Sequence, residues 1–141
     1  MSRKLAYTLL FDLNLFLGIT AVAGGIALLM AWIKLPLSSL AGSPFSDYTL
    51  PAVLLTAAVG GTALLAAWSV RARPSLCIRA SAIAAGAIII FEIVEWNVIG
   101  FAWLQAAYIG IGAAILGLAT GVRMADVLLH VPGSVPPRAT P

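Results

Sequence analysis

Residues 82–100 read AIAAGAIIIFEIVEWNVIG, an apolar run of membrane-spanning length that carries two glutamates, Glu92 and Glu95. About 20 predominantly apolar residues are enough for an α-helix to cross the hydrocarbon core of a bilayer. An ionised carboxylate at that depth costs at least about 2.5–3.5 kcal/mol. This segment therefore predicts a transmembrane helix whose acidic face is turned toward a bundle interior, a wet cavity or a partner.

The composition of the whole chain is that of a membrane protein. Of its 141 residues, 62% are hydrophobic and only 9% are charged, whereas a soluble domain carries about 25% charged residues. So few charges cannot cover a globular surface, and we expect the lipid bilayer to surround most of the chain. The net charge is +3, but the basic residues stand at the ends of apolar runs, which argues against nucleic acid as a partner.

Three further apolar runs accompany residues 82–100, so the sequence predicts an all-α integral membrane four-helix bundle. Ala21-Val22-Ala23 resembles a signal-peptide cleavage site, but Asp12 and Asn14 interrupt the preceding run, and we expect a retained first helix. The predicted segments are an N-terminal stretch 1–12, spans at 13–33, 50–70, 80–99 and 103–122, an outer loop 34–49, a basic loop 71–79, a tight turn 100–102, and a tail 123–141 that is disordered after about residue 131.

The positions of the basic residues predict the orientation. Four spans place both termini on one side of the membrane, and loops rich in Lys and Arg stay in the cytoplasm. Only Lys34 lies on the opposite side from the other basic residues, so we expect both termini in the cytoplasm; those residues are Arg3, Lys4, Arg71, Arg73, Arg79, Arg123 and Arg138.

Three hypotheses compete for the acidic pair. Glu92 and Glu95 are three residues apart on a helix, so their side chains share a face and approach within about 5–6 Å. They could form a proton relay or a cation site; they could receive a cation from another subunit; or a protonated glutamate could bond to polar groups of neighbouring helices, namely Asn14, Thr20, Thr56, Thr62 or Gln105. Asn97 and Gln105 complete the candidate site.

Other polar residues have simpler interpretations. Asp12 is expected to pair with Arg71, Arg79 or Arg123 at the interface, and Asp47 to cap the second span. Cys77 lies beside the membrane and is either a palmitoylation site or a plain interfacial cysteine, and His130 is expected on the surface. The sequence has one cysteine and one histidine and no phosphate-binding motif, so it predicts no enzyme, no metal and no cofactor.

Small residues recur every three or four positions along the fourth span, among them Gly110, Gly117 and Gly121. Such a face lets two helices approach closely. We expect ordinary packing within the bundle, with a GxxxG contact between chains as the alternative.

The chain also resembles a known group of proteins. Gly42-Ser43-Pro44-Phe45-Ser46-Asp47-Tyr48-Thr49 before Pro51, Glu95 in the third span, and Trp103-Leu104-Gln105 with Tyr108 and Gly110 are similar to a group of uncharacterised small four-helix membrane proteins of bacteria. The resemblance covers about residues 36–118 and implies a location in the bacterial inner membrane, but it brings no activity. Glu92 is not part of the shared pattern. Small multidrug transporters carry their essential glutamate in the first span, where this chain has only Asp12.

From these observations we expect a small accessory or interaction subunit of a larger membrane complex, with Glu92 and Glu95 facing a neighbouring helix. The alternative is a homo-oligomeric transporter or a proton-linked channel that uses the same two glutamates.

Overall fold

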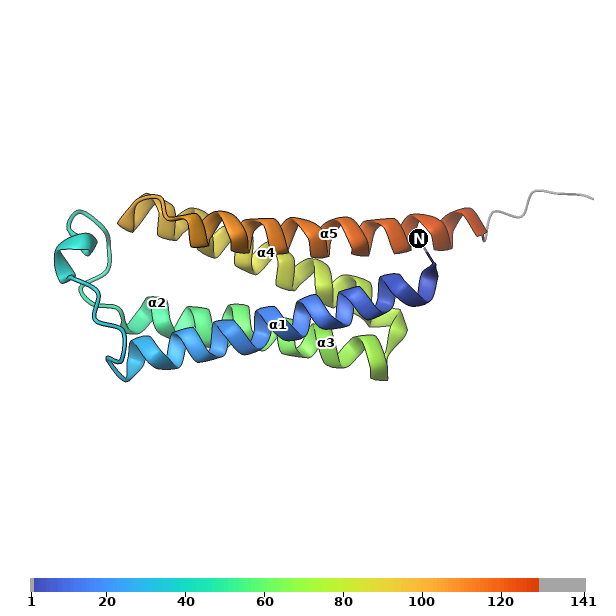
Figure 1. Ribbon diagram of the computed structural model, residues 1–141, viewed down its shortest axis with the longest axis horizontal. Helices are drawn as coiled ribbons and strands as arrows, with labels where there is room; N and C mark the ends of the chain where they lie inside the picture. The colour runs from blue at the N-terminus through green and yellow to red at the C-terminus, as the bar shows by residue number, and fades with distance from the viewer. Residues whose placement is uncertain (1, 130–141) are drawn as a thin grey trace, which may run out of the picture.

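A computed structural model describes residues 2–129. Within this range there is no strand, and four long helical rods run alternately up and down (Figure 1). Each rod is long and apolar enough to span a membrane, so the predicted all-α four-span bundle is confirmed. The elements are α1 (Arg3–Leu29), a short 3₁₀ helix η1 (Leu37–Leu40), α2 (Thr49–Val53), the π-helix η2 (Leu54–Gly61), α3 (Thr62–Ala72), α4 (Pro74–Ile99) and α5 (Trp103–Leu129).

The first helix differs from the prediction at both ends. It begins at Arg3, ten residues before the predicted span, because the Ser2 hydroxyl accepts a hydrogen bond from the backbone N–H of Leu5 (3.3 Å). It ends at Leu29 rather than at residue 33. Ala31 adopts a left-handed φ of 53°, and the amide of Trp32 turns back to the Ala27 carbonyl (2.9 Å).

Residues 71–79, predicted as a basic loop, are helical except at Arg73, the only residue between α3 and α4. Pro74, which was predicted to end the second span, is the first residue of α4. Proline suits the first turn of a helix because an amide hydrogen is not needed there. The tight turn 100–102 is found as predicted, with Gly100 at a left-handed φ of 85°. Helix α5 runs to Leu129, past residue 122; the disorder predicted after residue 131 and His130 lie outside the described residues.

The second span is a single rod with a π-helical middle. Helices α2, η2 and α3 follow one another without a break, and η2 covers eight residues. A π-helix bonds each N–H to the carbonyl five residues back. Threonine hydroxyls accompany it: Thr56 donates to the Ala52 carbonyl and Thr62 to the Ala58 carbonyl. Helix α1 packs closely here, since a Cβ on Gly60 would lie 2.6 Å from Val22 Cγ2.

The bundle is packed at one end and open at the other. We call the end that holds residues 30–48 the loop end and the opposite end, near Arg3 and Arg73, the terminal end (Figure 1). The main buried cluster runs from Ala6 and Val122 to Ile88 and Ile115, in the terminal and central parts. Toward the loop end, the backbone of α2 approaches α1 but neither α4 nor α5. Space therefore remains between the helices at the loop end.

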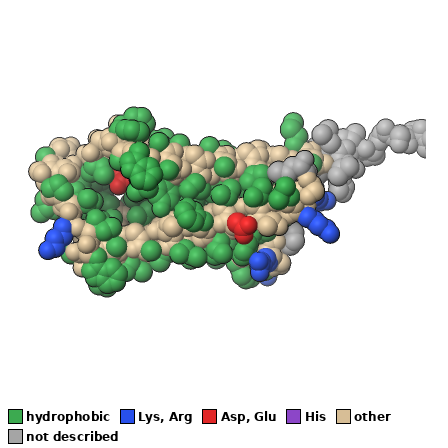
Figure 2. Space-filling model, in the orientation of Figure 1, with side chains coloured by type: hydrophobic (Ala, Val, Ile, Leu, Met, Phe, Trp, Pro, Cys, Tyr) green, Lys and Arg blue, Asp and Glu red, His purple; other side chains and the backbone are tan. Residues whose placement is uncertain are grey.

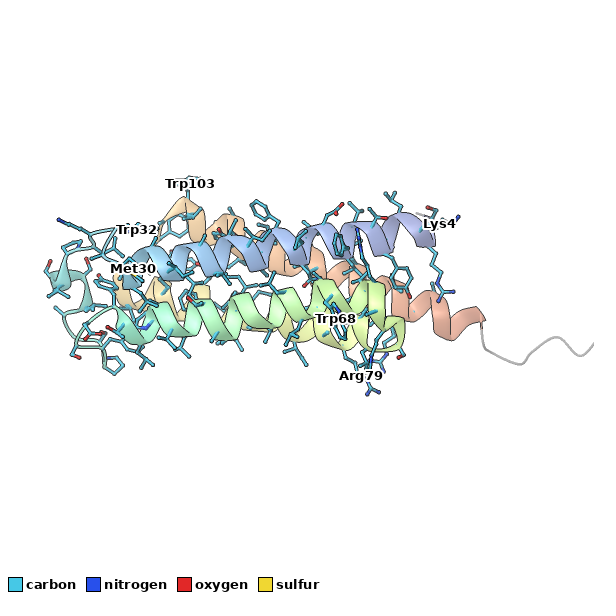
Figure 3. All side chains as sticks on the ribbon, turned by 90° about the horizontal axis from the view of Figure 1, so that it is seen from below. Lys4, Met30, Trp32, Trp68, Arg79 and Trp103 are labelled. Carbon is cyan, nitrogen blue, oxygen red and sulfur yellow. The ribbon has the colours of Figure 1, made fainter. Side chains whose placement is uncertain are left out.

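The two ends also differ in their surface side chains. Trp32 and Trp103 lie near the loop end, whereas Lys4 and Arg79 lie near the terminal end (Figure 3). Both tryptophans are strongly exposed, at 76% and 74%. Tryptophan is favoured where hydrocarbon meets headgroups, so the loop end suits one edge of a bilayer.

Candidate functional site

The two glutamates of α4 point into the bundle. Glu92 is only 4% exposed, and Glu95, one turn further, is half-buried. Their carboxyl groups lie close enough to share a hydrogen bond. Such a bond needs a proton on one of them, because an ionised carboxylate only accepts hydrogen bonds. The Oε2 atom of Glu92 is buried and has no partner.

Both glutamates line a cavity between α1, α4 and α5, which we call the polar lobe. Its volume is about 290 Å³, and its polar lining consists of Thr20, Glu92, Glu95, Gln105 and Tyr108. The remaining walls are apolar, from Ala21 and Leu28 on α1 to Ile88 and Phe91 on α4. A hollow near the loop end of the space-filling view contains acidic side-chain atoms (Figure 2).

A second cavity of about 280 Å³ lies between the second span, α4 and the loop, and we call it the apolar lobe. Its walls include Leu40, Phe45 and Tyr48 from the loop, Pro51 and Leu54 from the second span, and Ile90 and Val94 from α4. The Tyr48 hydroxyl donates to the Pro36 carbonyl (3.0 Å) and ties the loop together here. The residues that line both lobes are Leu28, Leu35, Leu55, Phe91, Glu95 and Ile99. The lobes are therefore neighbours, with Glu95 at their boundary.

Gln105 is the other buried polar residue of the polar lobe, at 3% exposed. It lies in the first turn of α5, and its Oε1 accepts a hydrogen bond from the backbone N–H of Ala102 (2.9 Å). The tight turn 100–102 thus brings Gln105 beside the acidic end of α4. Its Nε2 is buried without a partner, so this lobe holds one unsatisfied donor and one unsatisfied acceptor.

Asn97 does not belong to the site. Its side chain is exposed and donates to the Ile93 carbonyl of its own helix (2.7 Å), and it lines neither lobe. The helical period explains the difference, since Asn97 stands five residues after Glu92, on another face of α4.

The polar groups expected to bond a protonated glutamate are engaged elsewhere. The hydroxyls of Thr20, Thr56 and Thr62 all donate to carbonyls of their own helices. Asn14 donates to the Leu10 carbonyl (2.7 Å) and to Ser81 Oγ (3.1 Å), inside the packed core. Two of the expected partners keep a buried atom without a hydrogen bond: the amide oxygen of Asn14, in the packed core, and the amide nitrogen of Gln105, which is not bonded to Glu92.

The two aspartates predicted at the membrane interface, Asp12 and Asp47, make different contacts. Asp47 was expected to cap the second span, but the N-cap residue of α2 is Tyr48. Asp47 stands one residue earlier and accepts a hydrogen bond from the backbone N–H of Thr49 (2.8 Å). Asp12 is exposed on α1, and Arg71, one of its expected partners, instead lies over the ring of Phe11, 3.9 Å from the centroid. A guanidinium over an aromatic face is itself a favourable contact.

The glycines predicted to pack α5 inside the bundle do not do so. A Cβ added at Gly110, Gly117 or Gly121 would meet nothing within 4 Å. Gly112 is the glycine of α5 that packs within the chain, because a Cβ there would lie 2.8 Å from Ile89 Cγ1. The small-residue face of α5 is turned outward.

Cys77 is buried, with 0% of its surface exposed. A lipid-transferring enzyme cannot reach a sulfur inside a packed bundle, so the structure opposes the palmitoylation hypothesis. Among the described residues, no three His, Cys, Asp or Glu side chains are grouped so that they could hold a metal ion.

No family model, curated protein or solved structure matches the chain. The cavity itself defines the chemistry: an apolar chamber inside a membrane protein, with two carboxyl groups and one free amide donor on its wall. Tyr108 lines the polar lobe, and Tyr48 and Phe45 line the apolar lobe. None of the three was predicted to belong to the site. Tyr108 had a usable signal, because it stands three residues after Gln105 and therefore shares its face of α5.

Proposed function

We propose that this protein binds lipophilic cations inside the membrane, with Glu92 and Glu95 holding the cationic group. The observation that carries the proposal is that both glutamates line one hollow whose other walls are mostly apolar, with Glu92 buried in it.

Burying an ionised carboxylate in apolar surroundings is costly. A carboxylate in an apolar site is stabilised by an opposite charge at close range, because a low dielectric screens that attraction weakly. Among the residues that the structure describes, no Lys or Arg lines either lobe. A bound cation with an apolar body would neutralise the pair and fill the chamber, whereas a small hydrated ion would leave the apolar walls uncovered.

The orientation of the cavity follows from the distribution of basic residues. We propose that both termini are cytoplasmic, because Arg3, Lys4, Arg71, Arg73 and Arg79 lie at the terminal end and Lys34 lies at the loop end. The cavity then occupies the outer half of the membrane. Packed residues such as Ile88 and Ile115 separate it from the cytoplasmic half, so transport would require that layer to part.

Binding is tested with two probes of equal shape, N-ethyldodecylamine, which is a cation at neutral pH, and ethyl dodecyl ether, which is uncharged. Purified protein in lipid nanodiscs should bind the labelled amine, and the unfolding temperature should rise with its concentration. Glu92→Gln should weaken amine binding by at least about tenfold, which corresponds to loss of one charge-assisted contact.

The matched control is Asn97→Ala, which removes a polar side chain from the same helix but outside the cavity and should leave binding unchanged. Equal binding of the ether and the amine would refute recognition of a cation. Flux of the amine into proteoliposomes, measured in parallel, separates a carrier from a binding protein.

A second candidate function, the accessory subunit, is favoured by the outward face of α5. Gly110, Gly117 and Gly121 have open space where a side chain would be, and small residues let transmembrane helices approach closely. We propose a transmembrane helix of another subunit as the occupant. Gly117→Leu should then remove a co-purifying membrane protein without lowering the thermal stability of the chain itself; retention of that protein by Gly117→Leu would argue against the candidate.

A further inference from the structure

Residues of the polar lobe carry buried polar atoms without hydrogen-bond partners, and these atoms indicate which polar groups a ligand would bring in addition to its positive charge. Among the described residues, three buried side-chain atoms lack a hydrogen-bond partner: Asn14 Oδ1, Glu92 Oε2 and Gln105 Nε2. Asn14 belongs to the packed core beside Ser81. The other two belong to the same lobe, on facing helices. One is an acceptor on α4 and the other is a donor on α5.

The donor on α5 is held in place. Gln105 Oε1 accepts the N–H of Ala102 at 2.9 Å, so rotating the amide by a half-turn would point its NH₂ group at another donor. Nε2 therefore stays directed away from the turn. It is buried, and Gln105 is one of the residues that line the lobe. A buried donor without an acceptor costs about 1–3 kcal/mol. An occupant that brings an oxygen to this point would remove that cost.

The head group must also leave room for a tail. Glu95 lines both lobes, and apart from Glu95 and Tyr48 the second lobe is lined by apolar side chains. A head group held by the acidic pair thus places its first methylene groups at the entrance of the apolar lobe. The loop residues Leu40 and Phe45 form the far wall.

We propose that the ligand is a lipophilic amino alcohol, in which Glu92 and Glu95 hold the amine, Gln105 donates to the neighbouring oxygen and the chain lies in the apolar lobe. This inference rests on the proposed function and adds a specificity residue to it. Gln105 selects for the oxygen and is not needed for the charge.

The test compares two secondary amines that differ by one hydroxyl, N-dodecylethanolamine and N-ethyldodecylamine. Labelled probes are titrated into protein in nanodiscs, with protein-free nanodiscs subtracted. Wild-type protein should bind the amino alcohol about tenfold more tightly, the usual effect of one buried hydrogen bond. Gln105→Met should reduce that ratio to about one. Asn97→Ala should leave the ratio unchanged.

Using the ratio of two affinities guards against a variant that is merely less stable, because partial unfolding lowers both affinities equally. Equal binding of the two amines by wild-type protein would overturn the inference and leave the proposed function standing; it would mean that water satisfies Gln105. Binding of ethyl dodecyl ether as tight as that of both amines would overturn the proposed function itself. Preserved selectivity in a folded Gln105→Met variant would remove Gln105 from the site.

Discussion

Glu92 and Glu95 stand one helical turn apart on α4, yet they meet different surroundings. Glu92 is almost fully buried and lines only the polar lobe, whereas Glu95 is half-buried and lines both lobes. In the proposed function, we expect Glu92 to contribute most to the affinity for the cation, because a buried charge depends most on its partner. Glu95 lies where the two lobes meet, so it is better placed to determine which part of the proposed ligand lies in each lobe.

Most residues of the candidate site could be predicted from the sequence. Two features could not: the free donor of Gln105 and the position of Asn97 outside the site. Glu92 and Glu95 were visible as charges within an apolar run. Gln105 could be named as a polar residue at matching depth, but its free donor depends on the hydrogen bond to Ala102, which no sequence pattern reports. Asn97 was misplaced because closeness in sequence was taken for closeness in space.

The burial of Cys77 leads to a prediction about its reactivity. In folded protein the thiol should react with a soluble maleimide at least about a hundredfold more slowly than in protein unfolded by detergent and heat, because reaction requires the bundle to open. The measurement is the labelling rate followed by mass spectrometry. Rapid labelling of native protein would show that α4 does not bury this sulfur.

Among the helices, the second span and α1 make the closest contact through glycine. A Cβ on Gly25 would lie 2.7 Å from the Ala52 carbonyl oxygen and closer still to Thr56 Oγ1. Backbone cannot move aside as a flexible side chain can. The contact therefore depends on the absence of a side chain at this position.

This contact predicts that Gly25→Ala lowers the free energy of unfolding by about 1–3 kcal/mol, as overpacking of a tight site does. Gly117→Ala is the matched control, because open space surrounds that glycine, and it should change stability by no more than about 0.5 kcal/mol. Reversible unfolding in mixed micelles measures both. Equal effects of the two substitutions would contradict the close approach of α1 to the second span.

The helices themselves were predictable because hydropathy is a strong signal, but their ends were not. Pro74 was interpreted as the end of one helix, although it equally suits the start of the next. The end of α1 has no capping glycine, and Ala31 takes the left-handed conformation instead. The same residues are compatible with a helix that ends there and with one that continues or begins there, and tertiary packing decides between the two.

At the scale of the whole molecule, the protein is a bundle packed at the terminal end and hollow at the loop end. Hydropathy alone could predict four spans but not this asymmetry. The difference arises from how the rods diverge, since α2 approaches α1 but not α4 or α5. Crossing angles depend on which small residues meet, such as Gly18 and Gly60 with their neighbours.

The proposed orientation predicts a labelling pattern on intact cells. In a Cys77→Ala background, Ser46→Cys in the outer loop should react with a membrane-impermeant maleimide. Ser2→Cys should react only after the membrane is permeabilised. Both positions are exposed in the structure, so access to them depends on the membrane. The reverse pattern would place the termini, and the packed end, outside the cell.

The π-helix Leu54–Gly61 makes the shape of the cavity depend on chain length as well as on side chains. Removing one residue from this segment would favour a regular α-helix, which has about 3.6 residues per turn, fewer than a π-helix. The backbone at Leu54 and Leu55, on the wall of the apolar lobe, would then change its course. For this protein, a single-codon deletion in the second span is a larger evolutionary step than most substitutions, and natural variation in ligand size is best sought among insertions and deletions there.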